Sequence, residues 1–173
     1  MIRISSDRLL IRPLRIEDSR QVYAYRSNPD VVRYQMWCPT SEQEVKRFIR
    51  EQRGLAPGMP GIWYQFAIIE SGNDRLIGDC GVLVPIDEPD VAELGLTLHP
   101  ESQGKGFATE ALQALIDYCF HTLHVHCIIA RTHPDNSRSL ALLRNCRFSR
   151  IPSGQDVKKL IFILQNRNHT TTD

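Results

Sequence analysis

A turn with two glycines, placed between a predicted strand and a predicted helix, constrains this chain more than any other stretch. Residues Val91–Leu98 alternate between apolar and other side chains, as a strand with one buried face does. A polar turn leads to residues 103–110 (QGKGFATE), and from there apolar residues recur at every fourth position, which is the spacing of one helix face. The glycines therefore lie where a strand passes into a helix.

This arrangement is suited to binding a phosphate group. The first turn of a helix leaves main-chain N–H groups without partners, and the helix dipole adds partial positive charge there. Glycines let a phosphate approach these amides because no Cβ is in the way. The segment has no P-loop string G-x-x-x-x-G-K-[S/T], and Thr109 stands where the dinucleotide motif needs its third glycine. A pyrophosphate site and a plain strand-to-helix turn are the two interpretations of this motif alone.

Length and composition predict a single domain over residues 1–173. Hydrophobic residues make up 42% and charged residues 24%, which is ordinary for a soluble globular protein. The formal net charge of +1 does not suggest a nucleic-acid surface. No apolar run has the length of a membrane span, and the first residues lack the apolar core of a signal peptide. The five cysteines contain no C-x-x-C pair, so we expect reduced thiols and, by elimination, a cytoplasmic protein.

Periodicity and turn residues predict strands and helices along the whole chain. Ser41 followed by Glu44 is a capping-box signature for the start of the second helix. Residues 125–132 are apolar on both faces, which predicts a central strand. In order, we predict a strand at 8–14, helices at 17–26 and from 41, strands at 62–70, 75–84 and 91–98, a helix after the glycine turn, a strand at 125–132, a helix at 136–145 and a strand at 158–165.

Gln103, Gly106 and Ala108 form the string Q-x-x-G-x-A, which resembles the acyl-CoA pyrophosphate-binding motif of the GNAT (Gcn5-related N-acetyltransferase) superfamily. The longer string HPESQGKGFATEAL is similar to the RimJ/RimL branch, as are SDRLLIRPLRIEDSRQVYAYRSNP, PTSEQEVKRFI and NSRSLALLRNCRF. These segments occur in the family's order over nearly the whole chain. The resemblance implies an α/β (α+β) GNAT fold, with a mixed central sheet of about six to seven strands flanked by about four helices.

The resemblance also implies an activity, the transfer of an acetyl group from acetyl-CoA to a primary amine by direct attack in a ternary complex. The acceptor would be a protein N-terminus or a small-molecule amine. Pantetheine would run along the strand before the turn, and the turn would bind the pyrophosphate. Asn136 is equally suited to capping the last helix. The implied acetyl-CoA-binding residues are Leu96, Thr97, Leu98, Gln103, Gly104, Lys105, Gly106, Phe107, Ala108, Thr109 and Asn136.

Acetyl transfer requires that the amine lose a proton, that the thioester carbonyl be polarised and that the leaving thiolate be stabilised. Glu93 would lie on the strand face opposite the leucines. Carboxylates on this strand act as the base in some family members, and a structural ion pair is the other interpretation. Many members have a tyrosine in the last helix where this chain has Leu143, so Ser139 is the candidate that hydrogen-bonds the sulfur. Arg147 replaces the glycine that usually ends this helix, which predicts a different helix exit.

A metal site is not predicted, because no carboxylate or cysteine completes a ligand set with His121 and His124. The alternative function is a non-catalytic acyl-CoA-binding sensor or assembly module. Leu143 and the missing helix-end glycine favour that alternative, and Glu93 and Ser139 oppose it. A nucleotide-dependent binder is the third candidate, weakened by the lack of both nucleotide motifs. We expect no nucleic-acid or membrane partner, and the sequence leaves open the acceptor and the oligomeric state, a homodimer included.

Overall fold

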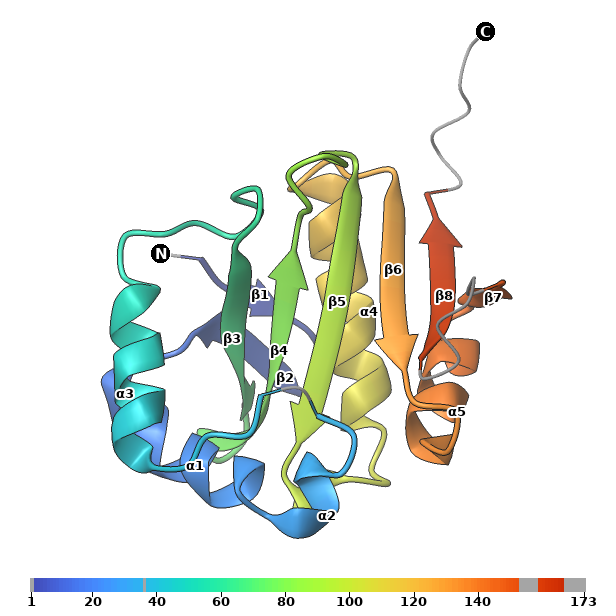
Figure 1. The fold of residues 1–173 in the computed structure, drawn as a ribbon. Coiled ribbons are helices and arrows are strands. Elements are labelled where there is room, and N and C mark those ends of the chain that lie inside the picture. Colours follow the sequence, from blue (N-terminus) through green and yellow to red (C-terminus); the bar gives the residue numbers. More distant parts are fainter. Residues whose placement is uncertain (1, 36, 153–158, 167–173) are drawn as a thin grey trace, which may run out of the picture.

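The computed structural model describes residues 2–35, 37–152 and 159–166, which form one mixed sheet with helices on both faces (Figure 1). Its eight strands have the order β1-β2-β3-β4-β5-β6-β8-β7. Neighbouring strands are antiparallel except β5 and β6, which are parallel. The predicted mixed α/β class is therefore confirmed. The strands are β1 Ile4–Ser5, β2 Leu9–Pro13, β3 Trp63–Glu70, β4 Arg75–Leu83, β5 Val91–Leu98, β6 Cys127–Thr132, β7 Ser149–Ile151 and β8 Leu160–Gln165.

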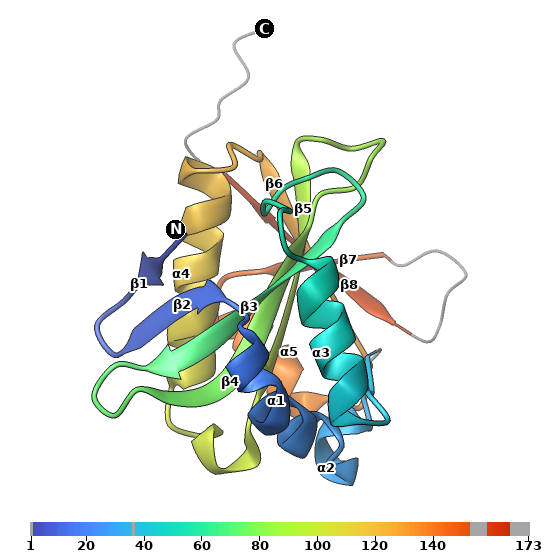
Figure 2. The ribbon, with the colours of Figure 1, turned by 90° about the vertical axis from the view of Figure 1, so that its left-hand side faces the viewer.

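Helices α1 and α3 cover one face of the sheet and α4 covers the other (Figure 2). No helix among the described residues is long and apolar enough to cross a membrane. The α-helices are α1 Ser19–Arg26, α2 Pro29–Val32, α3 Glu42–Glu51, α4 Phe107–His121 and α5 Ser137–Asn145, and two 3-10 helices span Ile16–Asp18 and Pro100–Ser102.

Each face of the sheet has its own hydrophobic core. On the α4 side, Ala111, Leu115 and Cys119 are fully buried, so the predicted helix face is the one that packs on the sheet. On the other side, Val45 of α3 and Ala67 of β3 belong to a second buried cluster. Because side chains alternate along a strand, β2, β3 and β4 contribute to both cores, whereas the apolar side chains of β5 and β6 pack on the α4 side.

Most predicted elements are confirmed, and the differences have local causes. The Ser41 hydroxyl accepts a hydrogen bond from Glu44 N (3.2 Å) and caps α3 as predicted. The sheet has two more strands than the lower predicted count, because β1 and β7 are only two and three residues long and carry no readable alternation. Asn28 follows Ser27, the C-cap of α1, and its side chain caps the short helix α2, which was not predicted. Lys158, the predicted start of the last strand, lies outside the described residues.

Strands β5 and β6 separate after a short paired region. Only Val91–Glu93 of β5 is paired with β6, whereas β4 pairs with β5 as far as Leu98. On its other side, β6 stays paired with β8 through Thr132. The ladder is therefore interrupted between the second halves of β5 and β6, and this opening lies at the end of the sheet where α4 and α5 begin (Figure 1).

Candidate functional site

The register of β5 determines which of its main-chain groups face the opening. His99 N–H donates to Ile77 O (2.8 Å), and alternate residues of an antiparallel strand point to the same neighbour. Thr97 therefore directs its main-chain groups toward β4, while Leu96 and Leu98 direct theirs toward the opening. Of the three predicted β5 residues, the two leucines have free-edge amides oriented for a ligand.

The glycine turn has the conformation that a phosphate site requires. Gly104 has φ +75° and Gly106 has φ +82°, and Gly106 is the N-cap of α4. The first helical hydrogen bond runs from Glu110 N to Gly106 O (3.1 Å), so the amides at positions 107–109 have no acceptor within the helix. Phe107, whose side chain is buried, contributes to the turn only through its main chain. The turn thus presents amides, with no Cβ at its two glycines, to an incoming pyrophosphate.

Arg8 reaches this turn from the β1–β2 hairpin and was not predicted as a site residue. Its guanidinium donates to Lys105 O (3.2 Å), lies 4.5 Å from the Phe107 ring centre and forms a 2.6 Å ion pair with Glu110. Burial opposes ionisation of Glu110, but hydrogen bonds from Arg8 and from Ser6 hold its pKa below the ordinary value. No local sequence pattern marks this contact, because it depends on how the hairpin packs against α4.

Gln103 connects the turn to both neighbouring elements. Its Nε2 donates to Leu98 O (3.1 Å) at the end of β5, and its Oε1 accepts a hydrogen bond from Arg138 in α5. Both ends of the side-chain amide are therefore bonded to the protein. The arrangement indicates that this motif residue positions the turn, while the adjacent amides are left for a ligand.

Both ends of α5 are capped by residues that directly flank the helix. The Asn136 side chain accepts a hydrogen bond from Ser139 N (3.1 Å), so it caps the helix, and Ser139 is half-buried in the first turn. Leu143 is buried in the core on the α4 side. Arg147 has φ +65°, and Phe148 N donates to Leu143 O (3.0 Å). The predicted difference in helix exit is wrong, because Arg147 adopts the left-handed conformation that glycine usually supplies.

Glu93 is the last residue of β5 that pairs with β6, and its side chain lies on the sheet face opposite α4. Its side chain is 12% exposed and forms an ion pair with Arg131 of β6, whose side chain is 38% exposed. Glu93 therefore forms the structural ion pair that was one of its two interpretations. Its carboxylate also lies at the edge of the opening, beside the space that an acceptor would occupy.

Tyr34 and Gln35, which follow α2, contact both sides of the opening on this same face. The Tyr34 hydroxyl donates to Asp135 O in the loop after β6 (3.3 Å), and its ring stacks on His133 with 5.4 Å between centres. Gln35 Oε1 accepts a hydrogen bond from the Thr97 hydroxyl of β5 (3.0 Å). No local sequence pattern predicts the position of this segment over the opening, because it depends on how the segment after α2 packs against the sheet.

The described residues contain no group of three or more His, Cys, Asp and Glu side chains placed to hold a metal ion. His121 Nδ1 lies 2.9 Å from Asp117 O within the last turn of α4. A hydrogen bond at a helix end accounts for this histidine without a metal.

Comparison with known proteins agrees with this geometry. The family described as an acetyltransferase (GNAT) domain matches residues 8–149. The N-acetyltransferase p20 of Bacillus licheniformis, itself uncharacterised, is 34% identical over 155 residues, which cover 89% of this chain and 86% of the relative.

Two solved structures share the fold. RimJ of Mycobacterium smegmatis in complex with CoA-disulfide has a TM-score of 0.78 and 19% identity, over 92% of this chain and 83% of that one. Spermidine N-acetyltransferase of Vibrio cholerae in complex with CoA and spermine has a TM-score of 0.78 and 20% identity, over 92% of this chain and 96% of that one. The resemblance based on Gln103, Gly106 and Ala108 is confirmed, and the chain belongs to the GNAT family of N-acetyltransferases.

Proposed function

We propose that this N-acetyltransferase moves the acetyl group of acetyl-CoA to a primary amine by direct attack in a ternary complex. The observation that carries the proposal is that the free edge of β5 and the amides at the start of α4 meet at one end of the sheet (Figure 1). A pyrophosphate on the α4 amides would leave the pantetheine arm to run along Leu98 and Leu96. The thioester would then lie in the opening between β5 and β6.

The free β5 amides supply the electrostatic part of catalysis. An amide directed into the opening from Leu96 would donate to the thioester oxygen as negative charge develops on it. The amide is fixed by the β4–β5 ladder, so it does not reorganise during the reaction. This arrangement supports the choice of Leu96 and Leu98 as main-chain contacts of the substrate.

Glu93 is the proposed base. Its carboxylate lies on the acceptor side of the sheet at the edge of the opening, where it could take a proton from the amine directly or through a water molecule. Ser139, in the first turn of α5, is the proposed hydrogen-bond donor to the leaving sulfur. Leu143 has no proton to give, so the thiolate would be stabilised by hydrogen bonding and would take its proton from water.

The three buried cysteines are poorly suited to forming a covalent acetyl-cysteine intermediate. Burial raises the pKa of Cys119 to about 12 and that of Cys146 to about 11, and it raises the pKa of Cys80 well above the ordinary value. Thiols held in the protonated form are poor nucleophiles at neutral pH. All five cysteines are free and three of them are buried, which fits a reducing compartment and supports the proposed cytoplasmic location.

The acceptor is proposed to be a primary amine of a protein N-terminus or of a small molecule. The Vibrio cholerae relative, whose structure contains spermine, supports the amine class and does not select among amines. The test is calorimetric titration with acetyl-CoA, with ATP and NADH as controls, followed by CoA release against polyamines, amino acids and N-terminal peptides. Failure to bind acetyl-CoA would overturn the proposal. Binding without CoA release from any acceptor would favour the non-catalytic acyl-CoA module instead.

A further inference from the structure

Trp63, the first residue of β3, is included in neither of the two hydrophobic cores that the described residues form. Ala67, four positions along the strand, is buried in the core beneath α1 and α3, so strand alternation places Trp63 on that same face of the sheet. Trp63 itself is only half-buried. Ligand sites are commonly lined by aromatic side chains, and a half-buried indole outside both cores is a candidate for such a contact.

The Trp63 indole extends over β4 and reaches β5, at two glycines that pair with each other. Gly81 of β4 and Gly95 of β5 are directly opposite in the antiparallel ladder. A Cβ at Gly81 would collide with Trp63 Nε1, and a Cβ at Gly95 would lie 3.0 Å from Trp63 Cζ2. Glycine inside a strand often marks a place where another group comes close to the main chain. The two glycines therefore make room for the indole on the central strands.

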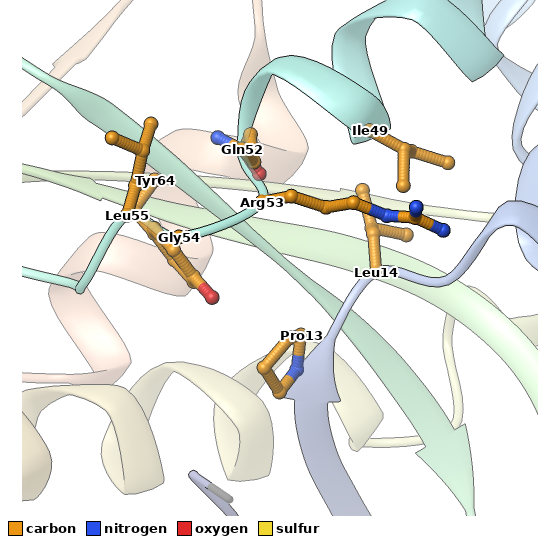
Figure 3. A pocket seen from close by; sticks show the side chains of 8 residues that line it. All are labelled: Pro13, Leu14, Ile49, Gln52, Arg53, Gly54, Leu55 and Tyr64. Atoms are coloured by element: carbon orange, nitrogen blue, oxygen red, sulfur yellow. The ribbon is translucent and has the colours of Figure 1, made fainter.

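Hydrogen bonds hold the indole in this orientation. Trp63 Nε1 donates to Gln65 Oε1 (2.6 Å), and the Gln65 amide nitrogen donates to the buried Asp79 carboxylate. The main chain is held as well, because Gln52, which lies at the C-terminal end of α3 (Figure 3), donates from Nε2 to Trp63 O (2.8 Å). The indole N–H is thus already bonded within the protein, and the part of the ring that remains for a ligand is apolar.

The edge of the Trp63 ring lies beside the proposed base. Gly95, which the ring edge contacts, is flanked on the same face of β5 by Glu93 and Thr97. Residues two apart in a strand are separated by about 7 Å, so the ring edge and the Glu93 carboxylate border the same space. Pairing of β5 with β6 ends at Glu93, so this space adjoins the opening. The Glu93 charge is compensated there by Arg131.

We infer that Trp63 contacts the acceptor and selects a monoamine that carries an apolar group close to its reacting nitrogen. The inference rests on the proposed acetyl transfer and adds the acceptor class to it. With the amine at Glu93, the apolar group would lie against the edge of the Trp63 ring. The ion pair of Glu93 with Arg131 carries no net charge, so it attracts the additional ammonium groups of a polyamine only weakly.

The experiment measures CoA release by the full chain, saturated with acetyl-CoA, with 2-phenylethylamine, ethanolamine and spermidine as acceptors. We expect kcat/KM to be at least about tenfold higher for 2-phenylethylamine than for the other two amines, because only its phenyl ring can be buried against the indole. Trp63→Leu should lower the ratio of kcat/KM for 2-phenylethylamine to that for ethanolamine about fivefold, since leucine is too short to reach Gly95. The Kd for acetyl-CoA should stay within about twofold.

The ratio compares two substrates of one enzyme, so a smaller folded fraction of a variant does not change it. Tyr64→Leu is the matched control, because it shortens the neighbouring aromatic side chain, which is buried on the opposite face of β3. This control should leave the ratio within about twofold of the wild-type value. Gly95→Ala keeps Trp63 but adds a Cβ 3.0 Å from its ring, and the displaced ring should lower the ratio about threefold.

The outcomes separate this inference from the proposed function. A chain that does not bind acetyl-CoA would overturn acetyl transfer and the role of Trp63 together. If acetyl-CoA binds but 2-phenylethylamine is not the best of the three acceptors, the role of Trp63 alone is overturned. The same holds if Trp63→Leu and Tyr64→Leu give equal ratios. If Trp63→Leu does not fold, Gly95→Ala decides, and an unchanged ratio in that variant overturns the inference.

Discussion

Glu93, the last β5 residue that pairs with β6, forms an ion pair with Arg131, which lies two residues beyond its pairing partner Ile129, where the two strands separate. The Glu93 side chain is mostly buried and the Arg131 side chain is partly open to solvent. The pair therefore fixes the carboxylate at the edge of the opening, on the face where Tyr34 and Gln35 lie. The Glu93 carboxylate at that point could both stabilise the sheet through the ion pair and act as the proposed base.

Replacing Glu93 separates these two roles. Glu93→Gln keeps the size and hydrogen-bonding capacity of the side chain but removes the base, so we expect kcat to fall about 100-fold or more. The Kd for acetyl-CoA should stay within about twofold, because the proposed contacts of that substrate are main-chain groups. Calorimetry and CoA-release kinetics measure the two quantities. The control is Glu88→Gln, an exposed carboxylate before β5; an unchanged kcat in Glu93→Gln would leave Glu93 with the structural role alone.

Replacing a glycine of the turn should weaken acetyl-CoA binding by more than backbone strain alone explains. Gly106→Ala places a Cβ 3.3 Å from Arg8 Nη2 at a residue with φ +82°. Gly54→Ala introduces the same left-handed strain at φ +83°, in a loop with no atom near the added carbon. Both variants should lose about 1–2 kcal/mol of unfolding free energy. Only Gly106→Ala should weaken acetyl-CoA binding, by about tenfold or more; equal Kd values in the two variants would argue against a pyrophosphate at this turn.

The turn could be predicted from the sequence because its determinants are local. The alternation before it, the glycines within it and the helix periodicity after it occupy one continuous stretch. Arg8 and Arg131 could not be predicted in the same way. Each meets its partner, Glu110 or Glu93, only after distant segments have packed together. The local sequence around an arginine is the same whether or not the fold brings a carboxylate close to it.

Thr97 shows a second limit of prediction from the sequence. The resemblance places the whole 96–98 segment along the pantetheine arm, but strand alternation divides it into two faces. Thr97 uses its hydroxyl on the other face, where Gln35 accepts from it and Arg26 donates to it. The pattern of apolar residues predicted the two faces correctly, whereas the partner of each polar residue depends on helices that pack over the sheet.

At the end of α5, replacing Arg147 by glycine should stabilise the protein. Arg147 holds φ +65°, where a side chain with a Cβ is strained and glycine is not. Arg147→Gly should therefore raise the unfolding free energy by about 1 kcal/mol. The matched control is Arg144→Gly, three residues earlier inside the helix, which should lower it by about 1 kcal/mol. Urea unfolding measures both, and a destabilised Arg147→Gly would mean that the arginine side chain makes a contact worth more than the strain.

A buried charge network joins α1 to the centre of the sheet. Asp79 of β4 is fully buried and accepts hydrogen bonds from Tyr25, from Gln65 and from Arg26 Nε (2.7 Å). Arg26 also donates to the Thr97 hydroxyl (3.3 Å). Burial works against the Arg26 charge, but the Asp79 carboxylate raises the pKa of Arg26 above its ordinary value. The two charges are therefore stable in the core only as a pair.

Asp79→Asn should cost about 3–5 kcal/mol of unfolding free energy, because it leaves the Arg26 charge buried without a counter-charge. Glu101→Gln is the matched control, since it breaks the exposed 2.8 Å pair with Arg75, and should cost less than about 1 kcal/mol. Adding Arg26→Met to Asp79→Asn should recover part of the loss by removing the stranded charge. Urea unfolding of the single and double variants measures the coupling. Additive losses in the double variant would show that Asp79 stabilises the fold through Tyr25 and Gln65 and not through the ion pair.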